Sequence, residues 1–78
     1  MAENIFAAAD EHFYDTRTEM LVAVKSVEFQ GRSRLLALVY AMTESGVTFV
    51  TLHPMRESQI ANRIDTGRWV PHEPEGSL

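Results

Sequence analysis

The order of hydrophobic and polar residues along the chain predicts a helix near the amino terminus and strands after it. Over residues 2–11, apolar side chains recur at three- and four-residue spacing, and the alanines among them favour a helix. A short strand around Tyr14 follows, then a polar turn at residues 16–19 and a longer, valine-rich strand over residues 20–29. Gly31 predicts the next tight turn, because glycine adopts positive φ without a steric penalty.

The middle of the chain predicts two further strands. Residues 33–42 are apolar at both odd and even positions from Leu35 onward, which is typical of a strand buried on both faces. A helix would give a similar run, but the turn residues that flank it and the β-branched, aromatic stretch at residues 47–52 favour strands. Short turns join these segments, so we expect an antiparallel meander. The strand at 33–42 should be central, and the short strand at Tyr14 should lie at one edge.

The strand pattern stops at Pro54, because proline lacks the N–H group that a sheet ladder needs. Residues 56–64 predict a second helix, since proline is tolerated at a helix start and apolar residues recur one turn apart. Trp69 should fold back onto the sheet as part of the core. The residues from 71 to 78 contain prolines, a glycine and glutamates, and we expect them to form a flexible tail.

Length and composition limit the chain to one small domain. It has 78 residues and no cysteine, so neither a disulfide nor a thiolate metal site can brace it. We expect a single α+β domain over residues 1–70, with an N-terminal helix, a three- to four-stranded antiparallel meander and a C-terminal helix, both helices lying on one face. No basic, apolar leader or membrane-spanning stretch is visible, which predicts a cytoplasmic protein without a membrane partner.

Charge is unevenly distributed along this acidic chain, whose net charge is −4. Residues 1–30 carry six acids against two basic residues, whereas residues 31–68 carry five arginines against three acids. The total charge argues against a nonspecific polyanion binder, but the second segment could hold a local anion site, since arginine suits forked recognition of phosphate. Solvated surface arginines would give the same pattern.

One cluster has the side chains that acid–base chemistry on a phosphodiester requires. His53 ends a strand, Arg56 lies in the first helical turn, Arg63 follows on nearly the same helical face, and Arg68 lies beyond the helix. The histidine would move protons while the guanidinium groups stabilise charge developing on phosphate oxygens. A non-catalytic anion site would use the same residues, and so would a structural cluster in which the arginines pair with nearby acids.

Three more residues are candidates for anion or RNA binding. Lys25 and Arg34 fall on neighbouring strands and would add positive charge to one sheet face, unless Glu28 neutralises them. Tyr40 could present its hydroxyl beside a substrate, although a tyrosine on a central strand is more often part of the core. No metal site is expected, because the three histidines lack ligand spacing. No cofactor is expected either, since the chain has neither a P-loop nor a dinucleotide fingerprint.

Short motifs are spread over residues 13–70. They are Tyr14-Asp15-Thr16, Val22-Ala23-Val24-Lys25, Gly31-x-x-Arg34, Val39-Tyr40, Val50-Thr51-Leu52-His53-Pro54 and Asn62-Arg63-Ile64-x-x-Gly67-Arg68-Trp69. This series resembles a group of small prokaryotic proteins that look related to the BrnT-type toxins and, more distantly, to the RelE/ParE toxin superfamily. The resemblance implies helices on an antiparallel sheet, metal-independent messenger RNA cleavage and an antitoxin protein as partner. The roles it implies fall on Lys25, Arg34, His53, Arg56, Arg63 and Arg68.

Two functions follow from these observations. The leading one is a toxin-like protein of the RelE/ParE or BrnT type that cleaves or binds RNA. The second is a non-catalytic module of the same fold that binds another protein or forms a homodimer, which a small core with an open sheet edge favours. Toxins of this type are usually basic, and the acidity of this chain favours the second function.

Overall fold

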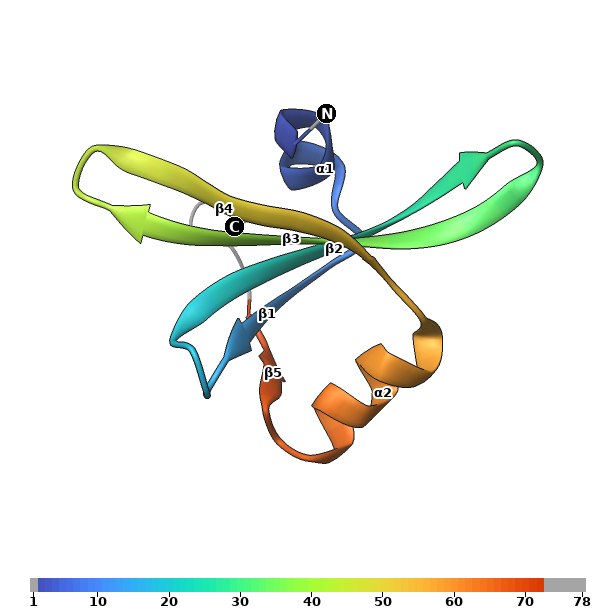
Figure 1. Ribbon diagram of the computed structural model, residues 1–78. Helices are drawn as coiled ribbons and strands as arrows, with labels where there is room; N and C mark the ends of the chain where they lie inside the picture. Colours follow the sequence, from blue (N-terminus) through green and yellow to red (C-terminus); the bar gives the residue numbers. More distant parts are fainter. Residues whose placement is uncertain (1, 73–78) are drawn as a thin grey trace.

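The computed structural model describes residues 2–72, which form one antiparallel sheet with a short helix on either side (Figure 1). The elements are α1 (Ala2–Ala8), β1 (Glu11–Asp15), β2 (Met20–Phe29), β3 (Arg32–Thr43), β4 (Gly46–Met55), α2 (Glu57–Asp65) and β5 (Trp69–Pro71). The strand order is β4-β3-β2-β1-β5, and every neighbouring pair is antiparallel.

The sheet dominates the molecule, so the predicted α+β arrangement with a three- to four-stranded meander is wrong. The helices have only seven and nine residues, whereas β2, β3 and β4 have ten, twelve and ten. A fifth strand, β5, pairs with β1 and was not expected, because three residues that end in Pro71 give little strand signal. As a result, β1 is not an edge strand, and β2 rather than β3 is central.

The two helices cover opposite faces of the sheet, not one face as expected (Figure 1). Successive residues of a strand point to opposite faces, so a strand that is apolar at both parities requires a cover on each side. The core on the α1 side contains Ile5, Ala23, Leu38 and Tyr40. The core on the α2 side contains Phe13, Val22, Val24, Ala37, Met55, Ile60 and Trp69.

Several local predictions are confirmed. Gly31 has φ +76° in the β2–β3 turn, and Trp69 is only 4% exposed.

Two element boundaries differ from the prediction. The second helix begins one residue later than expected, and the backbone N–H of Arg56 donates to Gln59 Oε1 (2.9 Å) at its start. Strand β4 runs through Pro54 rather than stopping there, because β4 is an edge strand and tolerates a missing donor.

The sheet also extends past the expected domain end at residue 70. Pro71 lies opposite Phe13 in the β1–β5 pair, and the backbone N–H of His72 donates to the carbonyl of His12 (2.9 Å). The rest of the predicted tail, residues 73–78, lies outside the described residues. Within residues 2–72, no helix combines the length and the apolar character that crossing a membrane demands.

Candidate functional site

The four residues predicted as catalytic occupy different surroundings. His53 is half-buried on β4 opposite Ala37, and Arg56 is exposed where the chain passes from β4 to α2. Arg63, in the last turn of α2, places its guanidinium carbon 6.0 Å from the centre of the Trp69 ring. Arg68 is bound to a carboxylate. Among residues 2–72, no hydrogen bond or ion pair joins the histidine to any of these arginines.

Arg68 is held by Asp15, the single buried charged or polar residue identified in the described part of the chain. The Arg68 Nε donates to both carboxylate oxygens (3.2 and 3.1 Å), and Trp69 Nε1 donates to Oδ2 (3.1 Å). The backbone N–H groups of Arg17 and Thr18 donate to Oδ1 (2.9 and 3.2 Å). Arg68 therefore joins β5 to the β1–β2 turn, and its charge is matched within the fold.

The electrostatics of Asp15 agree with this structural role. Burial works to raise its pKa, but the hydrogen bonds from Arg68, Arg17, Trp69 and Thr18 outweigh burial and lower the pKa from 3.8 to about 2. The carboxylate is therefore ionised at neutral pH and stabilises the guanidinium beside it. The sequence offered one signal for Asp15, since an aspartate that starts a polar turn often accepts hydrogen bonds from the next backbone N–H groups.

Tyr40 belongs to the core on the α1 side. Its side chain is almost fully buried, and its hydroxyl lies 3.1 Å from His12 Nδ1. The Phe6 ring packs edge-on against Tyr40, with 5.0 Å between the ring centres. Burial raises the pKa of Tyr40, and burial together with the neighbouring His72 lowers the pKa of His12. Both side chains are consequently neutral at pH 7 and fasten α1 to the sheet.

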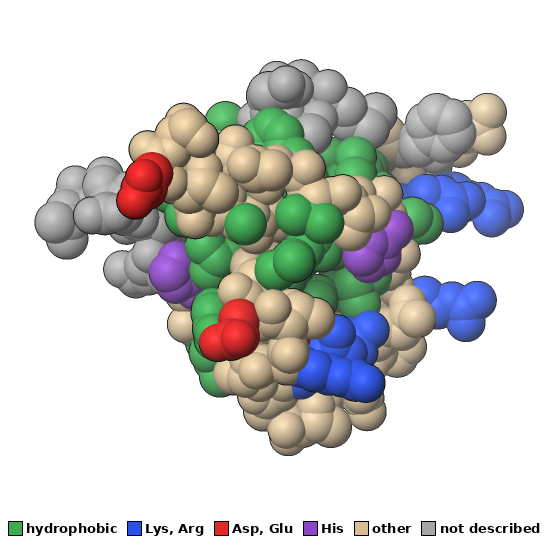
Figure 2. All heavy atoms as spheres, turned by 60° about the vertical axis from the view of Figure 1, so that its left-hand side comes forward, with side chains coloured by type: hydrophobic (Ala, Val, Ile, Leu, Met, Phe, Trp, Pro, Cys, Tyr) green, Lys and Arg blue, Asp and Glu red, His purple; other side chains and the backbone are tan. Residues whose placement is uncertain are grey.

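Lys25 and Arg34 do lie on the same face of neighbouring strands, but two residues out of register. Lys25 is opposite Leu36, and its ammonium group lies 3.4 Å from Asp10 Oδ1. Arg34 is exposed. It lies near Arg56, because the residue after Arg34 (position 35) is paired with the residue before Arg56 (position 55). Figure 2 shows that Lys and Arg side chains gather on one side of that view, apart from the acids, with hydrophobic side chains between them.

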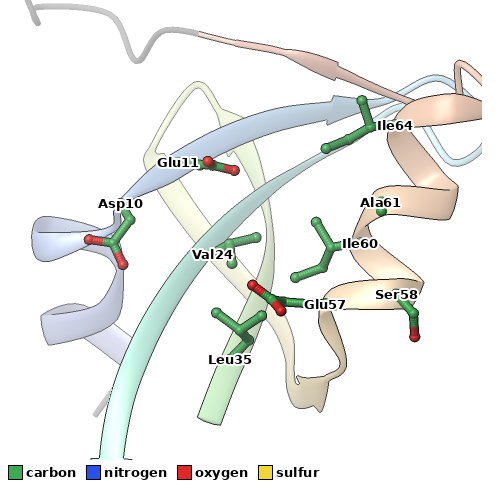
Figure 3. Close-up of a pocket in the computed structure, with 9 residues that line it drawn as sticks. All are labelled: Asp10, Glu11, Val24, Leu35, Glu57, Ser58, Ile60, Ala61 and Ile64. Carbon is green, nitrogen blue, oxygen red and sulfur yellow. The ribbon is translucent and has the colours of Figure 1, made fainter. Parts of the chain in front are cut away.

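A hollow of about 620 Å³ lies elsewhere, between α2 and the sheet (Figure 3). Val24 of β2, Leu35 of β3 and Ile60 of α2 face one another across its floor. Its rim carries three carboxylates, those of Asp10, Glu11 and Glu57. We refer to this hollow as the α2 groove. It could not be predicted from the sequence, because its lining comes from segments separated by ten to thirty residues along the chain.

Chemically, the α2 groove is apolar and acidic at once. Among residues 2–72, neither lysine nor arginine lines it, and the apolar side chain of Ile64 at its end is 40% exposed. The backbone N–H of Ser26 (3.0 Å) lowers the pKa of Asp10, and Lys25 adds to this effect, so Asp10 is ionised. Because its floor is apolar and its rim is acidic, the groove can take an apolar side chain with a cation beside it. No group of three or more metal-ligating side chains is found in residues 2–72.

Comparison with known protein families, with curated protein sequences and with solved structures finds no match for this chain. The resemblance to BrnT-type and RelE/ParE toxins accordingly stays a prediction.

Proposed function

We propose that this chain is a non-catalytic protein-interaction module that binds a partner protein through the α2 groove. The observation that carries the proposal is an open apolar floor with three carboxylates at its rim and no basic side chain among the described residues that line it. Exposed apolar surface of this kind gains free energy when a partner covers it, by about 25 cal/mol for each Å² removed from water.

The charge of the rim indicates the chemistry of the partner. Glu11 and Glu57 are exposed and would attract lysine or arginine side chains, which favours rapid and selective association. The floor requires apolar side chains between these cations. A basic amphipathic helix meets both requirements, since its apolar residues recur on one face and its charged residues flank them.

The placement of the predicted catalytic residues supports binding over RNA cleavage. Catalysis would need His53 and several guanidinium groups to converge on one phosphate. Arg68 is instead matched by Asp15, and Arg63 lies over the ring of Trp69. Two of the three arginines thus have structural partners, and releasing them would destabilise the packing of β5.

A designed peptide tests the proposal. It has about 18 residues, roughly five helical turns, with leucines on one face and lysines on both flanks. Titrating it into the ¹⁵N-labelled protein should shift amide resonances of α2 and of the segments around Val24 and Leu35. A control peptide with glutamates in place of the lysines should not bind, because its charges would meet the acidic rim.

Matched variants locate the contact. Glu57→Lys and Ile64→Ser should each weaken peptide binding about tenfold, which corresponds to about 1.4 kcal/mol. Asp65→Lys on the same helix and Val70→Ser, whose exposure of 38% is close to that of Ile64, should leave binding unchanged. Equal binding of the two peptides, or RNA cleavage that disappears in His53→Ala, would contradict the proposal.

A further inference from the structure

The two outer edges of the sheet differ in length. Among the described residues, β4 and β5 each have a hydrogen-bonded neighbour on one side alone. β5 presents three residues and ends at Pro71, whereas β4 presents ten. An edge strand offers unpaired N–H and C=O groups to any strand that approaches it. The β4 edge is therefore the long open edge of this sheet.

The β4 edge also lacks the charges that usually protect such edges. Its ten residues include no lysine, arginine, aspartate or glutamate, and Pro54 interrupts donation only near its end. The pairing with β3 shifts at a bulge, where Val39 is opposite Thr51 and Tyr40 is opposite Phe49. Val50 is consequently left without a residue opposite it, and half of it is exposed to solvent.

We propose that β4 pairs with β4 of a second copy of this chain. A two-fold axis brings the same edge of two copies together and makes the two strands antiparallel. The result is a continuous ten-stranded sheet, with five strands from each copy. Main-chain hydrogen bonds would join the copies, as in other cases of strand addition.

Charge explains why the contact between two copies would lie at this edge. Each copy carries a net charge of −4, so two copies repel one another wherever acidic surfaces meet. A neutral strand avoids this repulsion. Thr48, Val50 and Thr51 are β-branched residues, which pair favourably across strands. The other edge is short and ends in a proline, so the assembly closes at two copies instead of growing into a fibre.

This inference is independent of the α2 groove, because the groove lies on a face of the sheet and the β4 edge does not line it. A dimer would carry two grooves and could bind two segments of one partner. Self-association is measured without any peptide, so failure of the one proposal is distinguishable from failure of the other.

Sedimentation equilibrium from about 5 to about 500 µM tests the dimer. The mass should rise from 8.8 kDa toward twice that value as concentration increases. Val50→Lys should weaken the dimer at least tenfold in dissociation constant, since pairing would bury two ammonium groups near one another. Val70→Lys is the matched control, because it adds the same charge to the β5 edge and should not change the mass.

Amide hydrogen exchange supplies a second measurement. It needs no variant, so a loss of stability caused by a substitution cannot affect it. In the natural sequence, amides within residues 46–53 should exchange more slowly at high protein concentration than at low concentration, and those of β5 should not change. A single 8.8 kDa species at all concentrations would overturn the proposal. Dissociation by Val70→Lys but not by Val50→Lys would also overturn it, because the interface would then lie at β5.

Discussion

Replacing Asp15 by asparagine should be one of the most destabilising conservative substitutions in this protein. The carboxylate accepts hydrogen bonds from the Arg68 guanidinium, the Trp69 indole and two backbone N–H groups of the β1–β2 turn. Asp15→Asn keeps the shape of the side chain but removes its charge. It also places an NH₂ group where only hydrogen-bond donors approach, so one buried donor must lose its partner.

The size of the effect follows from the pKa of Asp15. The fold lowers this pKa from 3.8 to about 2, and each pKa unit corresponds to about 1.4 kcal/mol. The ionised carboxylate thus contributes about 2.5 kcal/mol to the free energy of unfolding at neutral pH. Leaving one buried donor unpaired costs a further 1–3 kcal/mol or so. We expect Asp15→Asn to lose about 4 kcal/mol and to lower the melting temperature by about 20 °C.

The lowered pKa of Asp15 also predicts how the free energy of unfolding changes with pH. Because the pKa of Asp15 is lower in the folded state than in the unfolded state, its contribution is complete above about pH 4. The contribution is lost as pH falls from there toward 2. The difference in stability between the natural protein and Asp15→Asn should therefore shrink over that interval.

Urea unfolding followed by the fluorescence of Trp69, the one tryptophan in the chain, measures these quantities at pH 7 and in steps down to pH 2. Asp65→Asn is the matched control, since Asp65 is exposed and its replacement should change stability by less than about 0.5 kcal/mol. An Asp15→Asn protein as stable as the natural one would refute the role assigned to this carboxylate. So would a difference that persists undiminished at pH 2.

Two further predictions concern the contact between Tyr40 of β3 and His12 of β1. Tyr40→Phe removes the hydroxyl beside His12 Nδ1 and should lower the free energy of unfolding by about 1 kcal/mol in urea titrations; an unchanged midpoint would contradict the hydrogen bond. Burial and His72 lower the pKa of His12 below 6.5, so stability from the neutral ring should be present above pH 6.5 and lost as pH falls below it. An NMR titration that places this pKa above 6.5 would show that the ring is not held in its neutral form.

The sequence predicted the strands and turns that depend only on residues close together in the chain. The valine-rich pattern at residues 20–29 and the turn at Gly31 gave the first long hairpin, because strand alternation and glycine conformation are local properties. The apolar residues at both parities of 33–42 correctly indicated a strand buried on both faces. They also implied a cover on each face, and the expectation of two helices on one face conflicted with that pattern.

The missed features depend on contacts between distant residues. Arg68 and Asp15 are 53 positions apart, and nothing near Arg68 shows that a buried carboxylate will take its charge. Whether the arginines meet at His53 could not be predicted, because their spacing along the chain says nothing about competing partners. The α2 groove could not be predicted for the same reason, since a cavity forms only after the helix and the sheet have packed together.

The adjacency of β1 and β5 has a consequence for the order in which the domain forms. The β2–β3 and β3–β4 pairs are closed by turns of a few residues, whereas pairing Tyr14 with Val70 closes a loop of more than fifty. Closing a longer loop loses more chain entropy before any contact is gained. The three-stranded meander should therefore assemble early in the transition state, and docking of β5 should be a late step that converts an open, partly covered sheet into the native domain.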